Sequence, residues 1–143
     1  MIQVNYSEWI GRQATQQDLI LDTKVQALAA TLDADVVSEE GAPLPPLWHW
    51  IFFNPMHKAS ELGHDGHAKK GGFLPPIDLP RRMWAGGRFE FIEPLRIGDK
   101  VSRVSTIKNV VLKEGKSGKL AFVTVEHDIR GETGGHWREE HDI

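Results

Sequence analysis

The sequence contains no cysteine, so disulfide bonds, thiolate zinc sites and a cysteine nucleophile are all excluded. No apolar run reaches membrane-spanning length, and residues 1–9 have neither the basic nor the apolar region of a secretory leader. The net charge of −3 at pH 7 leaves no excess positive field to attract nucleic acid. We therefore expect a cytoplasmic protein without membrane or nucleic-acid partners.

What the chain does contain is the balance of a globular domain, with 40% hydrophobic and 26% charged residues. Its 143 residues fit one domain that is large enough to bury a core. Glycine-x-serine-x-glycine and phosphate-loop motifs are both missing from the sequence. Serine nucleophilic catalysis and nucleotide hydrolysis therefore have no support.

One stretch has the spacing of an amphipathic helix. Asp22 or Thr23 suits the start of this helix, and apolar residues follow at intervals of three and four. These apolar residues are Val25, Leu28, Ala29 and Leu32. The pattern predicts a helix over residues 22–32 with one buried stripe. Residues 47–53 are apolar nearly all round, which predicts a second, buried helix that packs in a core or against a partner subunit.

The remaining regular elements are predicted to be strands, at residues 15–21, 89–94, 100–113, 120–130 and 136–143. Imperfect alternation in the third of these predicts a bulge, and a turn with two glycines at 114–119 predicts a hairpin. In the fourth, Val125, His127 and Ile129 share one face. A helix packed against an antiparallel meander is an α+β fold.

A proline-guided loop leads into the second of these strands. Pro75, Pro76 and Pro80 disfavour helix, so the loop is predicted to be extended and stiff. The residues that it presents are Arg81, Arg82, Trp84, Gly86 and Gly87. One interpretation is that they hold a phosphorylated or thioester-bearing ligand, since glycines let the backbone approach a ligand closely. The alternative is that the arginines are solvated and Trp84 fills the core.

Seven histidines raise the question of a metal site. The densest group comprises His64, Asp65 and His67, with His57 nearby. This glycine-rich loop lacks the closed, supported geometry of a structural zinc site, so we predict no metal. We expect His127 to be half-buried with its hydrogen bonds satisfied. His136 and His141 lie near the end of the sequence, and we expect both to be solvated.

Three segments carry a resemblance to a known family: residues 41–50, residues 79–91 with the run RRMWAGG, and residues 94–99. They resemble the N-terminal half of MaoC-like double-hotdog dehydratases, the mesaconyl-C4-CoA hydratases and type 2 hydroxyacyl-thioester dehydratases. The resemblance implies that residues 1–143 form one hotdog domain, an antiparallel sheet wrapped around the helix at 22–32. It also implies a CoA or acyl-carrier thioester as substrate, with no cofactor.

In that family two hotdogs form the active unit, and the working Asp/His pair belongs to the other half. The position that matches the catalytic aspartate is Asp33, but no Asn-Pro and no histidine follow it. Asn54-Pro55-Met56-His57 looks like the later part of an Asp-x-Asn-Pro-x-His signature, but Phe52 stands at its aspartate position and the match falls after the wrong helix. We interpret this match as chance. The resemblance therefore implies a non-catalytic half, completed by a second hotdog domain or a homodimer partner.

By the same resemblance, Arg81, Arg82 and Trp84, with Gly86 and Gly87, would line the acyl-thioester tunnel or the interface between the two halves. Two other functions stay open. The chain could be a thioester-binding or regulatory hotdog without chemistry, or a thioesterase, because hotdog folds host several activities. Thioester binding without turnover would favour the first, and release of free thiol would favour the second.

Overall fold

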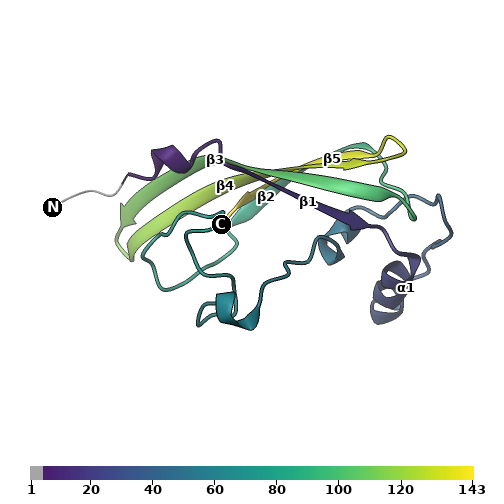
Figure 1. The fold of residues 1–143 in the computed structure, drawn as a ribbon, viewed down its shortest axis with the longest axis horizontal. Helices are drawn as coiled ribbons and strands as arrows, with labels where there is room; N and C mark the ends of the chain where they lie inside the picture. The colour runs from purple at the N-terminus through teal and green to yellow at the C-terminus, as the bar shows by residue number, and fades with distance from the viewer. Residues whose placement is uncertain (1–4) are drawn as a thin grey trace.

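The computed structural model describes residues 5–143 as one five-stranded antiparallel sheet with one α-helix (Figure 1). The strands are β1 (Gln13–Leu19), β2 (Gly86–Glu93), β3 (Lys100–Gly115), β4 (Gly118–Gly131) and β5 (His136–Asp142), and the helix is α1 (Asp22–Thr31). The order across the sheet is β1-β3-β4-β5-β2. Residues 1–4, part of the segment in which no secretory leader is expected, lie outside the described residues.

The β3–β4 hairpin is the longest part of the sheet. Its strands pair from Val101 opposite Gly131 to Gly115 opposite Gly118, where residues 116–117 form the turn. Gly118 has φ 117°, a conformation that favours glycine. The predicted bulge is confirmed as a register shift between Ile107 and Asn109. Both long strands were thus correctly predicted.

The predicted helix is confirmed with its end one residue earlier, and the first strand lies two residues before its predicted position. The Asp22 side chain accepts a hydrogen bond of 2.8 Å from the Thr23 backbone N–H. Val25 and Ala29 are buried, whereas Leu32 is 56% exposed, so the buried stripe is narrower than predicted. Within residues 5–143, no helix is long and apolar enough to cross a membrane.

Helix α1 and the long segment 32–85 lie on the same side of the sheet, with α1 near one of its ends (Figure 1). The main core joins residues from all of these parts. It contains Ile20, Val25, Leu44, Phe52, Phe53, Leu95, Ile97, Val101, Ile129 and Trp137. A second, smaller cluster of Ile107, Val123 and Val125 lies further along the hairpin. This layer of helix and loop on one sheet face is the predicted α+β arrangement.

The predicted second helix is wrong in its extent. Residues 47–53 form only a 3₁₀ turn, η2 (Trp48–Ile51), because Leu47 and Phe53 both have positive φ angles, 73° and 57°. Such conformations are unfavourable for these side chains and cannot continue a helix. Phe53 is buried as predicted, but Trp50 is 50% exposed. The strained turn instead directs two of its side chains at a polar cluster on the sheet.

Candidate functional site: a buried polar cluster and two grooves

The register of the sheet gathers polar residues on its core-facing side. On β4, His127 lies opposite Ser105 of β3 and opposite Glu139 of β5. Two residues away on β3 and on β5, and therefore on the same face, lie Arg103 and His141. Antiparallel pairing alone thus brings five chemically active side chains together.

Glu139 is the centre of this cluster. Its Oε2 accepts a hydrogen bond of 2.7 Å from His49 Nε2, and its Oε1 accepts one of 2.6 Å from Trp50 Nε1. His141 Nε2 donates to the same Oε1. Burial by itself raises the pKa of Glu139, but the bonds from His141, His49 and Trp50 prevail and hold it well below the ordinary glutamate value. Glu139 is therefore ionised at neutral pH although it is only 3% exposed.

His127 is held as a neutral imidazole. Burial, and then the positive charge of Arg103, lower its pKa to about 4. Its Nδ1 lies 2.7 Å from Ser105 Oγ, which has no other hydrogen-bond partner in the described part of the chain. The buried hydroxyl must therefore donate its proton to Nδ1, since otherwise that hydrogen would be left unpaired. His127 then carries its own proton on Nε2. The prediction of a half-buried histidine is confirmed, but its hydrogen bonds are only half satisfied, because Nε2 has no partner within the described residues.

These side chains open onto a groove of about 540 Å³, which we call the polar groove. Its lining residues are His49, Trp50, Phe52, Phe53, Asn54, Pro55, Trp84, Arg103, His127, Glu139 and His141. The His127 and His141 rings meet edge to face with their centroids 5.1 Å apart. The groove thus combines aromatic walls with an arginine, a glutamate and three imidazoles, a composition typical of small-molecule sites.

A second groove of about 580 Å³, the apolar groove, lies between the loop at 70–85 and the turn end of the β3–β4 hairpin. Its mostly apolar lining includes Leu74, Ile77, Leu79, Leu120, Phe122, Val123 and Ile143, and it also contains the predicted Arg81, Arg82 and Trp84. Lys70 Nζ fixes the loop by donating hydrogen bonds of 2.6 Å to the carbonyls of Ile77 and Leu79. Trp84 lines both grooves, so they meet at this side chain.

The predicted glycine pair begins β2 beside Trp84. A Cβ on Gly87 would lie 3.0 Å from the Glu140 carbonyl oxygen and 3.4 Å from Trp84 Cζ2. Glycine at this position therefore lets the tryptophan lie close to the sheet. Trp84 is 57% exposed, which rules out the alternative that it fills the core. The prolines of this loop fit the extended conformation, since no helix occurs in residues 70–85.

Of the other candidates, Asp33 and His57 lie apart from the two grooves, whereas Phe52, Asn54 and Pro55 line the polar groove. Asp33, the predicted match to the catalytic aspartate, is exposed just after α1 with φ 52° and lines neither groove. Phe52 is 3% exposed in the core, and the side chain of His57 is 42% exposed, 3.8 Å from Glu61. Within residues 5–143, no group of three or more histidine or acidic residues is arranged to hold a metal ion.

The expectation for the last two histidines was wrong. The His136 side chain is 15% exposed and that of His141 is 20% exposed, and both are bonded to carboxylates, His136 to Asp128 at 3.1 Å. Their place near the end of the sequence suggested solvation, but β5 lies inside the sheet, between β4 and β2. Side chains on an interior strand have same-face neighbours on both adjacent strands, which partly cover them.

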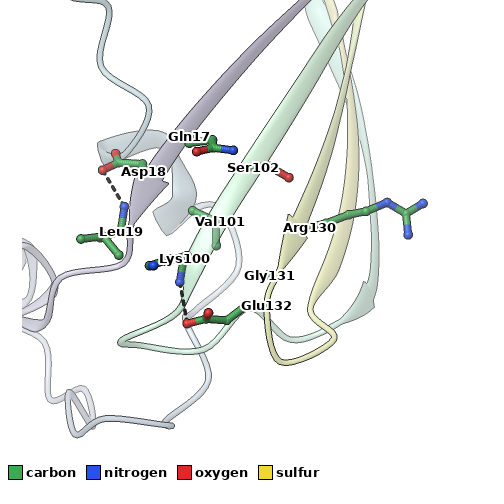
Figure 2. A pocket seen from close by; sticks show the side chains of 9 residues that line it. All are labelled: Gln17, Asp18, Leu19, Lys100, Val101, Ser102, Arg130, Gly131 and Glu132. Atoms are coloured by element: carbon green, nitrogen blue, oxygen red, sulfur yellow. Dashed lines mark hydrogen bonds between the residues drawn. The ribbon is translucent and has the colours of Figure 1, made fainter.

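A shallow hollow at the other end of the sheet is shown in Figure 2. It lies where β1, β3 and β4 come together, and none of the predicted site residues line it. Its acidic side chains already bind backbone: Asp18 accepts from Leu19 N at 2.7 Å, and Glu132 accepts from Lys100 N at 3.1 Å. These carboxylates stabilise the strand ends and leave little for a ligand.

Sequence reasoning missed Arg103, Glu139 and His49 entirely. A signal existed for the first two. Once His127 is assigned to the inner face, the turn at 131–135 fixes the pairing that puts Glu139 opposite it, and alternation puts Arg103 on the same face. No sequence pattern points to His49, because it reaches the cluster through the irregular turn η2.

Comparison with known proteins fits this architecture. The sequence model of the family described as hydroxyacyl-thioester dehydratase type 2 matches residues 47–143. The mesaconyl-C(4)-CoA hydratase of Chloroflexus aurantiacus is 46% identical over 130 residues, which cover 90% of this chain and 46% of that protein. The chain thus spans about half the length of this curated relative.

Solved structures extend the likeness at low sequence identity. The HadBC (3R-hydroxyacyl-ACP dehydratase) complex of Mycobacterium tuberculosis contains a chain with TM-score 0.64 and 14% identity, with 95% of this chain and 96% of that chain covered. R-hydratase PhaJ1 of Pseudomonas aeruginosa gives TM-score 0.54 at 15% identity, with 94% of this chain and 79% of that chain covered. A hot-dog-like protein of Thermanaerovibrio acidaminovorans gives TM-score 0.53 at 12% identity, with 97% of this chain and 85% of that chain covered. The predicted hotdog fold is confirmed.

Proposed function

This chain belongs to the hydroxyacyl-thioester dehydratase type 2 family, and we propose that it forms the substrate-binding half of an enoyl-thioester hydratase/dehydratase. The reaction adds water across the α,β double bond of an acyl thioester on CoA or an acyl carrier, or removes it. A second hotdog unit, linked or separate, supplies the acid/base pair. The reaction is neither a reduction nor an oxidation, and we propose that it needs no resident cofactor.

The place of Asp33 is the observation that supports the non-catalytic assignment. This match to the family's catalytic aspartate is exposed after α1 and lines neither groove, and Phe52, at the aspartate position of the Asp-x-Asn-Pro-x-His pattern, is 3% exposed in the core. The histidine of the pattern, His57, has a 42% exposed side chain and lines neither groove. General acid/base catalysis needs both groups within reach of the substrate. A half in which an apolar side chain replaces the acid fits binding and orientation rather than proton transfer.

The two grooves supply what such a half needs. The apolar groove fits the extended arm of the thioester, with Arg81 and Arg82 available to anionic groups of the carrier. Trp84, supported by the close approach at Gly87, joins this groove to the polar groove. We propose that the acyl end passes Trp84 into the polar groove, where the second hotdog unit acts on it. Contact with the aromatic walls would hold the thioester in one orientation.

A hydration assay tests this function. Loss of the conjugated enoyl-thioester absorbance would be followed with crotonyl-CoA and mesaconyl-C4-CoA, first on this chain alone. The same assay would then include, as a separate chain, the part of the C. aurantiacus relative that this chain does not cover. We expect no turnover by this chain alone, and turnover when the second half is added.

Turnover by the chain alone would contradict the proposal. Release of free thiol would indicate a thioesterase, and binding without turnover under either condition a binding module.

A further inference from the structure

Arg103 is a cation on the core-facing side of an interior strand, and it has no counter-ion. Its Nη2 donates a hydrogen bond of 3.0 Å to Gln16 Oε1, and its guanidinium lies 5.0 Å from the centroid of the Phe53 ring. No carboxylate within residues 5–143 lies within 4.0 Å of it, and its Nε is buried without a partner. Buried charges in proteins are normally paired. The guanidinium of Arg103 could therefore pair with an anion from outside the described residues.

Glu139 does not fill that role. Both of its oxygens are already taken by donors from His49, Trp50 and His141. Burial lowers the pKa of Arg103, and the distant negative charge of Glu139 only partly opposes this effect. The carboxylate thus stabilises the guanidinium through space without bonding to it. Its three bonds also keep it from competing for the guanidinium at close range.

The unused donors of Arg103 open toward the polar groove. Its Nη1 has no hydrogen-bond partner in the described chain and, unlike Nε, is not among the fully buried atoms. His127 lines the same groove and carries its proton on Nε2. A planar guanidinium edge beside a neutral imidazole N–H is a donor set that suits a carboxylate. Lys would not match this geometry, because its ammonium is a point charge.

We propose that Arg103 is a specificity-determining residue that pairs with a carboxylate carried by the acyl group of the substrate. The inference rests on the proposed function, because it assumes that the acyl end enters the polar groove past Trp84. It adds the residue that would recognise an acyl group with a free acid besides its thioester, such as that of mesaconyl-C4-CoA. A phosphate of the carrier has similar chemistry, and the experiment below separates the two sources.

Binding to the unmodified chain gives the first test. Calorimetric titration at one fixed salt concentration would compare mesaconyl-C4-CoA, which has a free carboxylate, with its methyl ester and with crotonyl-CoA. A charge-assisted hydrogen-bond pair predicts that the acid binds roughly 10- to 100-fold more tightly than either neutral thioester. Equal affinity for all three would overturn the proposal. This comparison needs no variant, so it cannot fail through misfolding.

Arg103→Gln gives the second test, with Arg130→Gln as the matched control. Arg130 extends away from the strands (Figure 2), is 64% exposed and pairs with Asp128. We expect Arg103→Gln to abolish the preference for the acid while crotonyl-CoA binding stays unchanged, and Arg130→Gln to behave as the parent chain. Equal weakening of all three thioesters would place the anion on the carrier and overturn the acyl assignment. Thermal melting would verify that both variants fold.

The outcomes separate this inference from the proposed function. Binding of crotonyl-CoA without any preference for the acid would refute the role of Arg103 and leave the substrate-binding half intact. An Arg103-dependent preference with no turnover in the presence of a second half would refute the hydratase and leave the carboxylate site intact. No binding of any thioester would refute both.

Discussion

Charged side chains on the two faces of the sheet differ in their partners. On the outer face, Arg88 bonds Glu140 and Asp142 at 3.0 Å, and Arg138 bonds Glu90 at 3.3 Å. These groups are paired with opposite charges and are at least a quarter exposed to solvent. On the inner face, the ionised Glu139 meets only imidazole and indole donors, and Arg103 meets no carboxylate. The two patterns alternate residue by residue along the same strands.

This difference distinguishes ordinary surface ion pairs from charges that are kept on the inner face for another reason. Exposed ion pairs contribute little to stability, and water would solvate their members if the pairs were lost. Charges on the inner face are costly to bury and are rarely kept unless something offsets the cost. Local departures from good packing are expected at functional sites. The contrast therefore makes the inner cluster the candidate functional site, and each prediction below perturbs one of the two faces.

Glu139→Ala is expected to have the largest effect. It leaves the N–H groups of the buried His49 and of Trp50 without their acceptor, which costs about 3–5 kcal/mol of unfolding free energy. Urea denaturation measures this loss. The neighbouring Glu140→Ala is the matched control, and on the outer face it should cost less than about 1 kcal/mol. Similar losses for the two variants would contradict the distinction between the faces.

His127 makes the stability of the fold depend on pH. Its folded-state pKa is lowered to about 4 by burial and by Arg103, whereas the unfolded value is about 6.5. Between these values the unfolded chain binds a proton that the folded chain does not, so stability falls as pH falls. Between about pH 7 and about pH 5 this component is on the order of 2 kcal/mol.

His127→Gln removes that component and should flatten the decline, whatever its effect at neutral pH. Unfolding free energies of parent and variant, measured at several pH values in this window, give the two slopes. Identical slopes would show that His127 is not held neutral. Glu139 does not disturb this comparison. Its pKa is lowered in the folded chain, and the measured pH values all lie above about 4.3, the ordinary pKa of glutamate, so glutamate is largely ionised in both states.

Arg103→Met should stabilise the protein. Methionine keeps much of the contact with Phe53 and removes a half-buried charge that has no ion-pair partner, at the loss of one hydrogen bond to Gln16. We expect the unfolding free energy to rise by about 1 kcal/mol. Arg130→Met, on the outer face, should change it by less than about 0.5 kcal/mol. A clear destabilisation by Arg103→Met would mean that the guanidinium is a structural group.

The same contrast explains what could be predicted from sequence. Periodicity identified the helix at 22–31, the long hairpin and its bulge, because these elements follow local spacing. The proline loop with Arg81, Arg82 and Trp84 was recognised from its composition and family likeness, and these three residues do line one groove. Whether they bind substrate stays a prediction.

The inner cluster could not be predicted from local sequence patterns, and the reason is physical. Its members come together through register across three strands and through a strained turn, and neither is visible in a window of a few residues. The turn η2 was predicted as a helix because its residues are uniformly apolar, but tertiary contacts to Glu139 override that preference. His141 was misjudged because nearness to the end of a sequence is a poor guide to exposure.

Arg88→Ala should have the smallest effect, although Arg88 donates four hydrogen bonds to carboxylates on the outer face. Its bonds to Asp142 and Glu140 raise the pKa of the guanidinium, but its side chain is 57% exposed and water replaces those bonds. We expect the melting temperature to fall by at most about 4 °C at low salt. Because salt screens exposed pairs, the difference from the parent chain should shrink further at high ionic strength. A large loss that persists in high salt would show that the outer network is structural, and would remove the contrast between the two faces.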